Sequence, residues 1–268
     1  MKAIEFAAWA AKPLTVATLI AGLALPFAAR AEQPVCDVPQ DMLRLAKPLA
    51  HVAKKIANHE PLVIVAVGSS STAGAGASSP SMNYPSRLAV ELKQFFRHSP
   101  ITVVNRGVNG EEIADMLQRF DEAVVKAKPD LVLWQLGTNS VIRDHVIAAH
   151  DAQIHDGLAR IRAVGADVVL IDPQYAPKVI VKAQVNQMVE LIATAAKRED
   201  VDLFRRYDVM RRWNDVDHIP FEVSVSPDGL HQNDWSYGCM AKGLAQSIAE
   251  AANRPIMSAT ARASSVMP

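Results

Sequence analysis

A serine-rich stretch and a distant aspartate–histidine pair hold the side chains that nucleophilic attack on a carbonyl requires. The stretch GSSSTAG offers Ser69, Ser70 and Ser71, and DGLH places Asp228 three residues before His231. One turn of backbone lets the carboxylate accept a hydrogen bond from Nδ1 of the histidine, which leaves Nε2 free to take a serine proton. A DxxH pair is also what a helix cap beside a surface histidine produces, so this pair alone does not decide the chemistry.

Two further residues could stabilise the negative charge that such an attack places on the carbonyl oxygen. Gly110 lies in NRGVNGEE and could offer a backbone N–H, while Asn139 lies in LGTNS and could offer its side-chain amide. Each residue is also an ordinary turn residue. The informative feature is the order of the groups along the chain: serine, glycine, asparagine, then aspartate and histidine.

The pattern of apolar residues predicts the elements that must position these groups. The predicted strands are the apolar runs at 62–67, 101–105, 131–136, 167–171 and 201–204. Helical patterns lie near 40–58, 84–97, 111–127, 150–164, 181–198 and 234–252. Because the loops after parallel strands meet at one edge of a sheet, distant residues of the chain can converge there. We therefore expect a three-layer α/β/α flavodoxin-like sandwich with a five-stranded parallel sheet.

The first of the polar stretches resembles a block of the SGNH hydrolase family, also called the GDSL-like lipases and esterases. GSSSTAG is similar to the family block GDSxTxG, with Gly68, Thr72 and Gly74 in matching positions. In this register Ser70 stands in the position of the nucleophile, and Ser69 stands where the family usually has Asp. The resemblance implies that Ser70 is the nucleophile and that its N–H is one donor to the oxyanion.

The remaining blocks are similar in the same order. The resemblance implies that Gly110 and Asn139 are the other oxyanion donors and that Asp228 and His231 complete the catalytic triad. Ser140 follows Asn139, where the family commonly has Asp. The chain has no GxSxG elbow, HExxH motif or Cys/His cluster, and neither a metal nor another cofactor is implied.

The activity implied is that of an exported serine esterase, which hydrolyses carboxylic esters through an acyl-enzyme on Ser70. The expected substrates are small acyl esters or acylated carbohydrates, with acetyl groups removed from the carbohydrate. The alternatives are a lipid or thioester acyl hydrolase, a polysaccharide O-acyltransferase, and a non-catalytic surface-binding protein. With 28 basic and 28 acidic residues the formal net charge is zero, so nucleic acid is not an expected partner. The oligomeric state stays open.

The N-terminus reads as an export signal. Lys2 and Lys12 precede an apolar run over 13–29, and the sequence Ala29-Arg30-Ala31 fits the small-x-small pattern of a cleavage site. We expect residues 1–31 to be a signal peptide, with no stable membrane insertion after cleavage and a periplasmic or secreted product. An uncleaved membrane anchor is the alternative. Residues 32–253 would form the hydrolase domain, and 254–268 a disordered tail.

The two cysteines of the chain, Cys36 and Cys239, both follow the predicted signal peptide. In an oxidising compartment they can pair, and two cysteines allow one connectivity. We expect a disulfide that ties the N-terminal arm to the last helix. Two unpaired buried thiols are the alternative.

Overall fold

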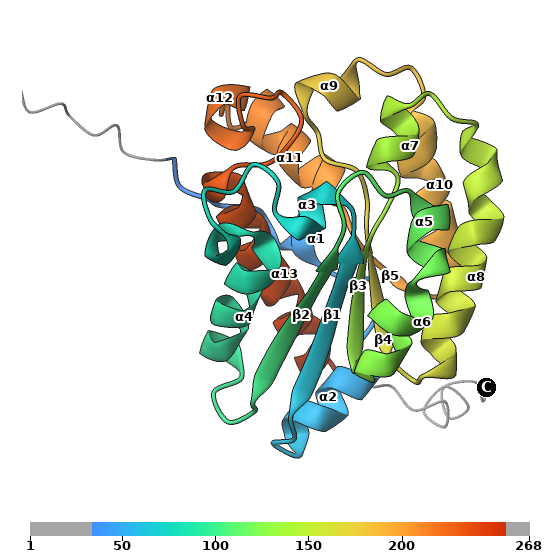
Figure 1. The fold of residues 1–268 in the computed structure, drawn as a ribbon. Coiled ribbons are helices and arrows are strands. Elements are labelled where there is room, and N and C mark those ends of the chain that lie inside the picture. Colours follow the sequence, from blue (N-terminus) through green and yellow to red (C-terminus); the bar gives the residue numbers. More distant parts are fainter. Residues whose placement is uncertain (1–33, 256–268) are drawn as a thin grey trace, which may run out of the picture. The chain divides into compact units, whose positions relative to one another are not determined.

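The protein is described by a computed structural model, which covers residues 34–255. Its centre is a parallel sheet with the strand order β2-β1-β3-β4-β5, which confirms the predicted five-stranded, flavodoxin-like arrangement. The strands are β1 (Leu62–Gly68), β2 (Ile101–Gly107), β3 (Leu131–Gln135), β4 (Asp167–Ile171) and β5 (Asp202–Phe204) (Figure 1). The predicted signal peptide, 1–31, lies outside the described residues, as does nearly all of the predicted tail, 254–268.

Helices cover both faces of the sheet, as Figure 1 shows. One layer contains α4 (Tyr84–Phe95) and α13 (Asp234–Asn253), together with α1 (Gln40–Leu43) and α2 (Ala50–Ala57). The other layer contains α5 (Ile113–Gln118), α6 (Phe120–Ala123), η2 (Val125–Ala127), α8 (His150–Ala163) and α10 (Val185–Arg198). The short connecting helices are α3 (Ser70–Ala73), η1 (Pro80–Met82), α7 (Thr138–Ile142), η3 (Ile147–Ala149), α9 (Pro177–Ile180), α11 (Arg206–Asp215) and α12 (Phe221–Ser224). None of the helices within 34–255 combines the length and the hydropathy that a membrane span needs.

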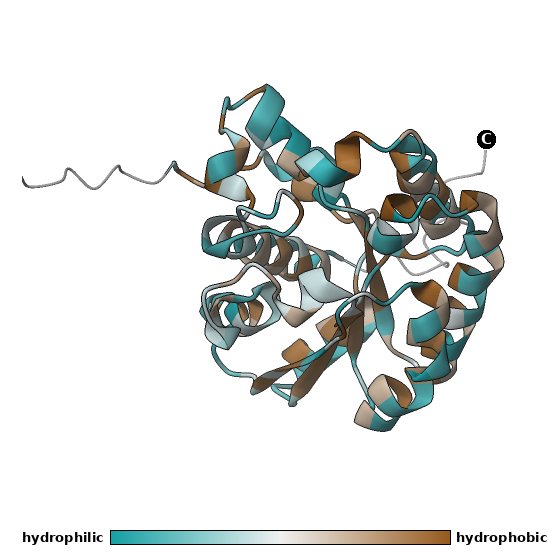
Figure 2. Ribbon diagram, turned by 45° about the horizontal axis from the view of Figure 1, so that its top comes forward, coloured by the Kyte–Doolittle hydropathy of each residue, from teal (hydrophilic) through white to brown (hydrophobic). Residues whose placement is uncertain are grey.

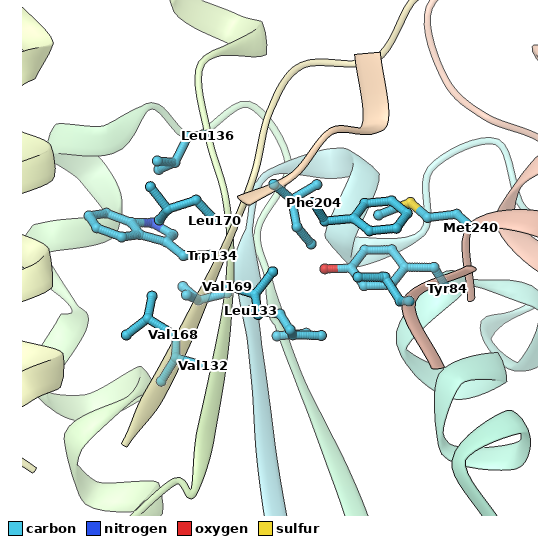
Figure 3. Packing of buried hydrophobic residues seen from close by; sticks show 14 of the residues in the cluster. Tyr84, Val132, Leu133, Trp134, Leu136, Val168, Val169, Leu170, Phe204 and Met240 are labelled. Carbon is cyan, nitrogen blue, oxygen red and sulfur yellow. The ribbon is translucent and has the colours of Figure 1, made fainter. Parts of the chain in front are cut away.

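The strands are apolar on both faces because each face packs against a layer of helices. Figure 2 shows hydrophobic strands surrounded by helices whose outer faces are hydrophilic. In Figure 3, Val132 and Trp134 of β3 point to one side of the sheet, whereas Leu133 points to the other side. Tyr84, Phe204 and Met240 lie on that second side with Leu133 (Figure 3), and all of these side chains are buried.

Two predicted helices are broken in the structure. The helix expected over 40–58 is divided into α1 and α2, since Pro48 disfavours helical geometry at the residue before it. The helix expected over 111–127 is divided into α5, α6 and η2. Arg119 ends α5 with a backbone φ of −108° and ψ of 11°, and its guanidinium donates to the carboxylate of Glu111 and the carbonyl oxygen of Arg106. The second break therefore coincides with contacts to the end of β2 and to the loop that follows it.

The N-terminal arm is attached to α13. Cys36 and Cys239 form a disulfide with their Cα atoms 5.4 Å apart, and the indole N–H of Trp235 donates to the carbonyl oxygen of Pro34 over 2.9 Å. These contacts join residues that lie about 200 positions apart in sequence.

The carboxyl ends of β1 and β2 are level, because Gly68 pairs with Gly107. A Cβ atom at Gly107 would lie 2.0 Å from the backbone nitrogen of Ala73, so only glycine allows α3 to pack this closely on β2. The side chain of Asn105 donates from Nδ2 to the carbonyl oxygen of Thr72 over 2.8 Å. The loop after β1 is thus held against the strand that precedes Gly110.

Candidate active site

The three consecutive serines at the end of β1 have different surroundings. Ser69 is buried, and both its N–H and its hydroxyl donate to Oε1 of Gln135, over 2.9 Å and 3.0 Å. Ser71 is also buried and donates to Oε1 of Gln174 over 3.4 Å. Ser70 begins α3 and is partly exposed. Of the three hydroxyls, that of Ser70 is the one within hydrogen-bonding distance of His231.

His231 bridges Ser70 and Asp228. Its Nε2 atom lies 2.8 Å from Oγ of Ser70, and its Nδ1 atom lies 2.5 Å from Oδ2 of Asp228. Because Nδ1 faces a carboxylate, the ring carries its proton there and presents an unprotonated Nε2 to the hydroxyl. The geometry is that of a base oriented by a carboxylate and directed at one alcohol.

A tight loop holds Asp228 and His231 in this relation. Antiparallel pairing of Val225 with Gln232 closes the loop. Oδ1 of Asp228 accepts hydrogen bonds from the hydroxyl of Ser226 and from the backbone N–H groups of Leu230 and His231. Partial burial would raise the pKa of the Asp228 carboxyl, but the hydrogen bonds from His231, Ser226 and Leu230 outweigh it and lower that pKa. Asp228 therefore stays ionised as the partner of the imidazole.

The expected oxyanion donors lie on the neighbouring loops. Gly110 has a φ of +80°, a conformation that favours glycine. Within residues 34–255, the N–H groups of Ser70 and Gly110 have no hydrogen-bond acceptor, so both are free to donate to a ligand. Nδ2 of Asn139 donates one proton to the carbonyl oxygen of Glu111 over 2.7 Å, and its second amide proton is not required by that bond. The structure thus brings Asn139 and the loop of Gly110 into direct contact.

Two buried glutamines that the sequence analysis missed connect the loops. Oε1 of Gln135 accepts from Ser69, as described, and from the hydroxyl of Thr72 over 3.4 Å. Oε1 of Gln174 accepts from Ser71 and, over 2.8 Å, from the hydroxyl of Thr138. Its Nε2 atom donates to the carbonyl oxygen of Leu230 over 3.2 Å. Gln174 therefore contacts the sequence neighbours of Ser70, Asn139 and His231.

Comparison with known proteins gives a family and a fold. A family model described as the non-GDSL lipase-like family matches residues 35–254. No curated protein matches the chain.

Solved structures share the fold at low sequence identity. A variant of an acetyl-xylooligosaccharide esterase from Geobacillus stearothermophilus is 19% identical with a TM-score of 0.60, over 70% of this chain and 94% of that chain. A two-domain esterase active on acetylated mannans is 16% identical with a TM-score of 0.65, over 81% of this chain and 57% of its own. TesA is 21% identical with a TM-score of 0.59, over 69% and 97%.

Proposed function

This chain belongs to the non-GDSL lipase-like family, and on that premise we propose that it is a serine esterase that works through an acyl-enzyme on Ser70. Membership makes the chain an ester-hydrolysing enzyme of the SGNH type, in agreement with the resemblance drawn from its sequence. The name of the family also fits the first block, in which Ser69 replaces the Asp of GDSL. The observation that carries the proposal is the row of contacts from Asp228 through His231 to Ser70.

In the acylation step, Oγ of Ser70 attacks the ester carbonyl carbon while Nε2 of His231 takes its proton. The negative charge that forms on the carbonyl oxygen is stabilised by the N–H groups of Ser70 and Gly110 and by the amide of Asn139. His231 then gives its proton to the alkoxy oxygen as the carbon–oxygen bond breaks, and the alcohol leaves. The acyl group of the substrate is then bound to Oγ of Ser70 as an ester.

In the deacylation step, a water molecule attacks the acyl carbon, and His231 takes a proton from that water. The bond between the acyl carbon and Oγ of Ser70 breaks as His231 returns the proton to the serine. The carboxylic acid leaves and the starting enzyme is restored. Asp228 stays ionised throughout and stabilises the imidazolium that forms in each step.

The substrate we propose is an acylated carbohydrate from which small acyl groups, acetyl above all, are removed. The support is that structurally similar proteins are described as acting on acetylated xylooligosaccharides and mannans. The structural similarity establishes a shared fold, and a fold does not determine a substrate, so the substrate is tested by assay.

That test compares initial rates on p-nitrophenyl esters from acetyl to palmitoyl and on acetylated xylo- and manno-oligosaccharides, with Ser70→Ala as the control. We expect acetyl esters to react fastest and acetate to be released from the oligosaccharides. A preference for long chains would instead support a lipid or thioester acyl hydrolase. Transfer of acetyl to a second sugar without free acetate would support an O-acyltransferase. Rates equal to those of Ser70→Ala on every substrate would support a binding protein.

We also propose that the enzyme is exported and acts in the periplasm or outside the cell. The support is the signal-like sequence over 1–31 and the disulfide between Cys36 and Cys239, a bond that persists in oxidising compartments. N-terminal sequencing of the protein from a secreting host should begin at Glu32. A product that retains residues 1–31 would favour the membrane anchor.

A further inference from the structure

Glu112 joins the two loops that carry Gly110 and Asn139. Oε2 of Glu112 accepts a hydrogen bond from the hydroxyl of Ser140 over 2.8 Å and lies 2.9 Å from Nδ1 of His145. Oε1 of Glu112 accepts from the guanidinium of Arg143. The loop after β2 is therefore connected through one carboxylate to three residues that follow β3.

Two further contacts between the same loops, to backbone carbonyl groups, complete the junction. Nη2 of Arg143 donates to the carbonyl oxygen of Gly110 over 2.9 Å, and Nδ2 of Asn139 donates to the carbonyl oxygen of Glu111. The two carbonyl groups belong to Gly110 itself and to the next residue, so both contacts fix the backbone that carries the free N–H of Gly110. A movement of one loop would therefore displace both donor groups.

Several contacts and partial burial hold the side chain of Glu112 in one position. It caps α5 through reciprocal hydrogen bonds with Asp115, and its side chain is only 12% exposed. Burial would raise the pKa of this carboxyl, but hydrogen bonds from Arg143, Ser140 and His145 outweigh it and lower the pKa. The carboxylate is consequently charged at neutral pH, and charge-assisted hydrogen bonds of this kind are stronger than neutral ones.

We propose that Glu112 is the positioning residue of the oxyanion hole. Its carboxylate lies on the loop after β2 and supplies the negative charge that the neutral side chain of Ser140, on the loop after β3, lacks. SGNH sequences commonly have Asp at that position, and here the hydroxyl of Ser140 instead donates to Glu112. The proposal rests on the proposed esterase function, since Glu112 acts through Gly110 and Asn139 and touches no reacting atom.

A loosened junction should slow the chemical step and leave substrate binding largely intact. The donors must be aligned with the oxygen as charge develops on it, and losing one such donor costs on the order of 10²- to 10³-fold in rate. Removing the charge of Glu112 misplaces the donors without deleting them. We therefore expect Glu112→Gln to lower kcat by about 10- to 100-fold and to change KM by less than about threefold.

The test adds a charge-relocation variant. Glu112→Gln is compared with the double variant Glu112→Gln/Ser140→Asp, which returns a carboxylate to the junction from the other loop. We expect the double variant to recover most of the lost kcat. Ser140→Ala, which removes one hydrogen bond from Glu112, should lower kcat by about three- to tenfold. If Glu112→Gln does not fold, the kcat of Ser140→Ala tests the proposal in its place. Glu122→Gln on α6, an exposed residue paired with Lys126, is the matched control and should keep the kcat of the parent protein.

Three results would overturn the proposal: a kcat within threefold of the parent for both Glu112→Gln and Ser140→Ala, a rise in KM at constant kcat, or a loss of kcat that Ser140→Asp does not rescue. The last result, with a lowered melting temperature, would show that Glu112 only stabilises the fold. Ser70→Ala separates these outcomes from failure of the esterase proposal. If Ser70→Ala abolishes turnover while Glu112→Gln keeps it, only the role of Glu112 is wrong.

Discussion

The Nε2 atom of His231 lies 2.8 Å from Oγ of Ser70, although 161 positions separate the two residues in sequence. Ser70 follows β1, the second strand from one edge of the sheet, and His231 precedes α13. Strand β1 lies between β2 and β3, where the chain changes its winding direction, and such a point is where open α/β sheets usually bind ligands. The fold therefore forms the contact at the edge where loops from several strands meet.

Replacement of Asp228 tests how the imidazole is oriented. In Asp228→Asn an amide N–H could donate to Nδ1 of His231, which would move the ring proton to Nε2 and remove the base. We expect kcat to fall by about 10²- to 10⁴-fold with little change in KM. Asp234→Asn, at a carboxylate that bonds Ser78, is the control. Equal activities for Asp228→Asn and the parent would show that the carboxylate does not orient His231.

The parent enzyme should lose activity on acidification. Protonated imidazole cannot take the proton of Ser70, so activity requires a neutral His231. The logarithm of kcat/KM plotted against pH should therefore fall on the acid side with a limiting slope of one. A profile that shows no such fall down to the pH at which the protein unfolds would exclude histidine as the base.

Replacement of Gln174 should lower the activity, because its side chain forms hydrogen bonds with Ser71, Thr138 and Leu230. Gln174→Met keeps most of the volume but removes all three hydrogen bonds. We expect kcat/KM to fall by about 10- to 100-fold, since small displacements of catalytic groups are costly. Gln94→Met, at an exposed position of α4, is the control. Unchanged kinetics for Gln174→Met would show that the loops keep their positions without it.

The disulfide predicts a chemical result and a stability result. Thiol titration of the denatured, unreduced protein should find no free thiol, whereas two free thiols would contradict the bond. Cys36 and Cys239 are 203 positions apart, and in the chain-entropy model a bond that closes so long a loop stabilises the fold by roughly 5 kcal/mol. Cys36→Ser/Cys239→Ser should therefore melt at a lower temperature but keep its kcat.

The contribution of Asp202 to the stability of the fold should be larger in mild acid than at neutral pH. Its side chain is buried and accepts the backbone N–H of Lys47 over 2.9 Å. Burial raises the pKa of this carboxyl to about 6, although hydrogen bonds from Lys47 and Ala46 partly oppose the effect. Because the folded pKa lies above the unfolded one, the stabilising contribution is complete below about pH 4 and is lost as pH rises through about 6.

Asp202→Asn keeps the acceptor oxygen and removes the buried charge. We expect it to raise the melting temperature at pH 8, with a free-energy gain of up to about 3 kcal/mol because one pKa unit corresponds to about 1.4 kcal/mol. The gain should vanish towards pH 4. Asp121→Asn, at an exposed position of α6, should show no such trend. A variant that melts lower than the parent at pH 8 and equally at pH 4 would contradict the argument.

The strands could be predicted from sequence because both faces of each are buried, which leaves uninterrupted apolar runs such as that of β1. Helix α11 could not, since half of the residues in its sequence RYDVMRRWND are charged. Arg206 begins this helix and is fully buried, contrary to the usual behaviour of arginine. Tertiary packing determines that element more than local pattern does.

The residues of the candidate site also form two groups, those that the sequence identifies and those that it does not. Ser70, Gly110, Asn139, Asp228 and His231 could be located because their order and spacing resemble blocks of a known family. Gln174 and Glu112 carry no such signal, and each resembles an ordinary polar residue in a loop. Their partners lie 28 to 103 positions away along the chain, so their contacts depend on loop geometry that a sequence pattern does not contain.

The central claim is that Ser70 is the activated nucleophile, and covalent labelling tests it most directly. A fluorophosphonate reacts with a serine whose proton is taken by a neighbouring base, and Ser70 is the one of the three serines whose hydroxyl lies next to His231. Peptide mapping by mass spectrometry should therefore place one adduct on Ser70, with no labelling of Ser70→Ala and continued labelling of Ser71→Ala. An adduct on Ser69 or Ser71, or labelling that persists in Ser70→Ala, would contradict the account.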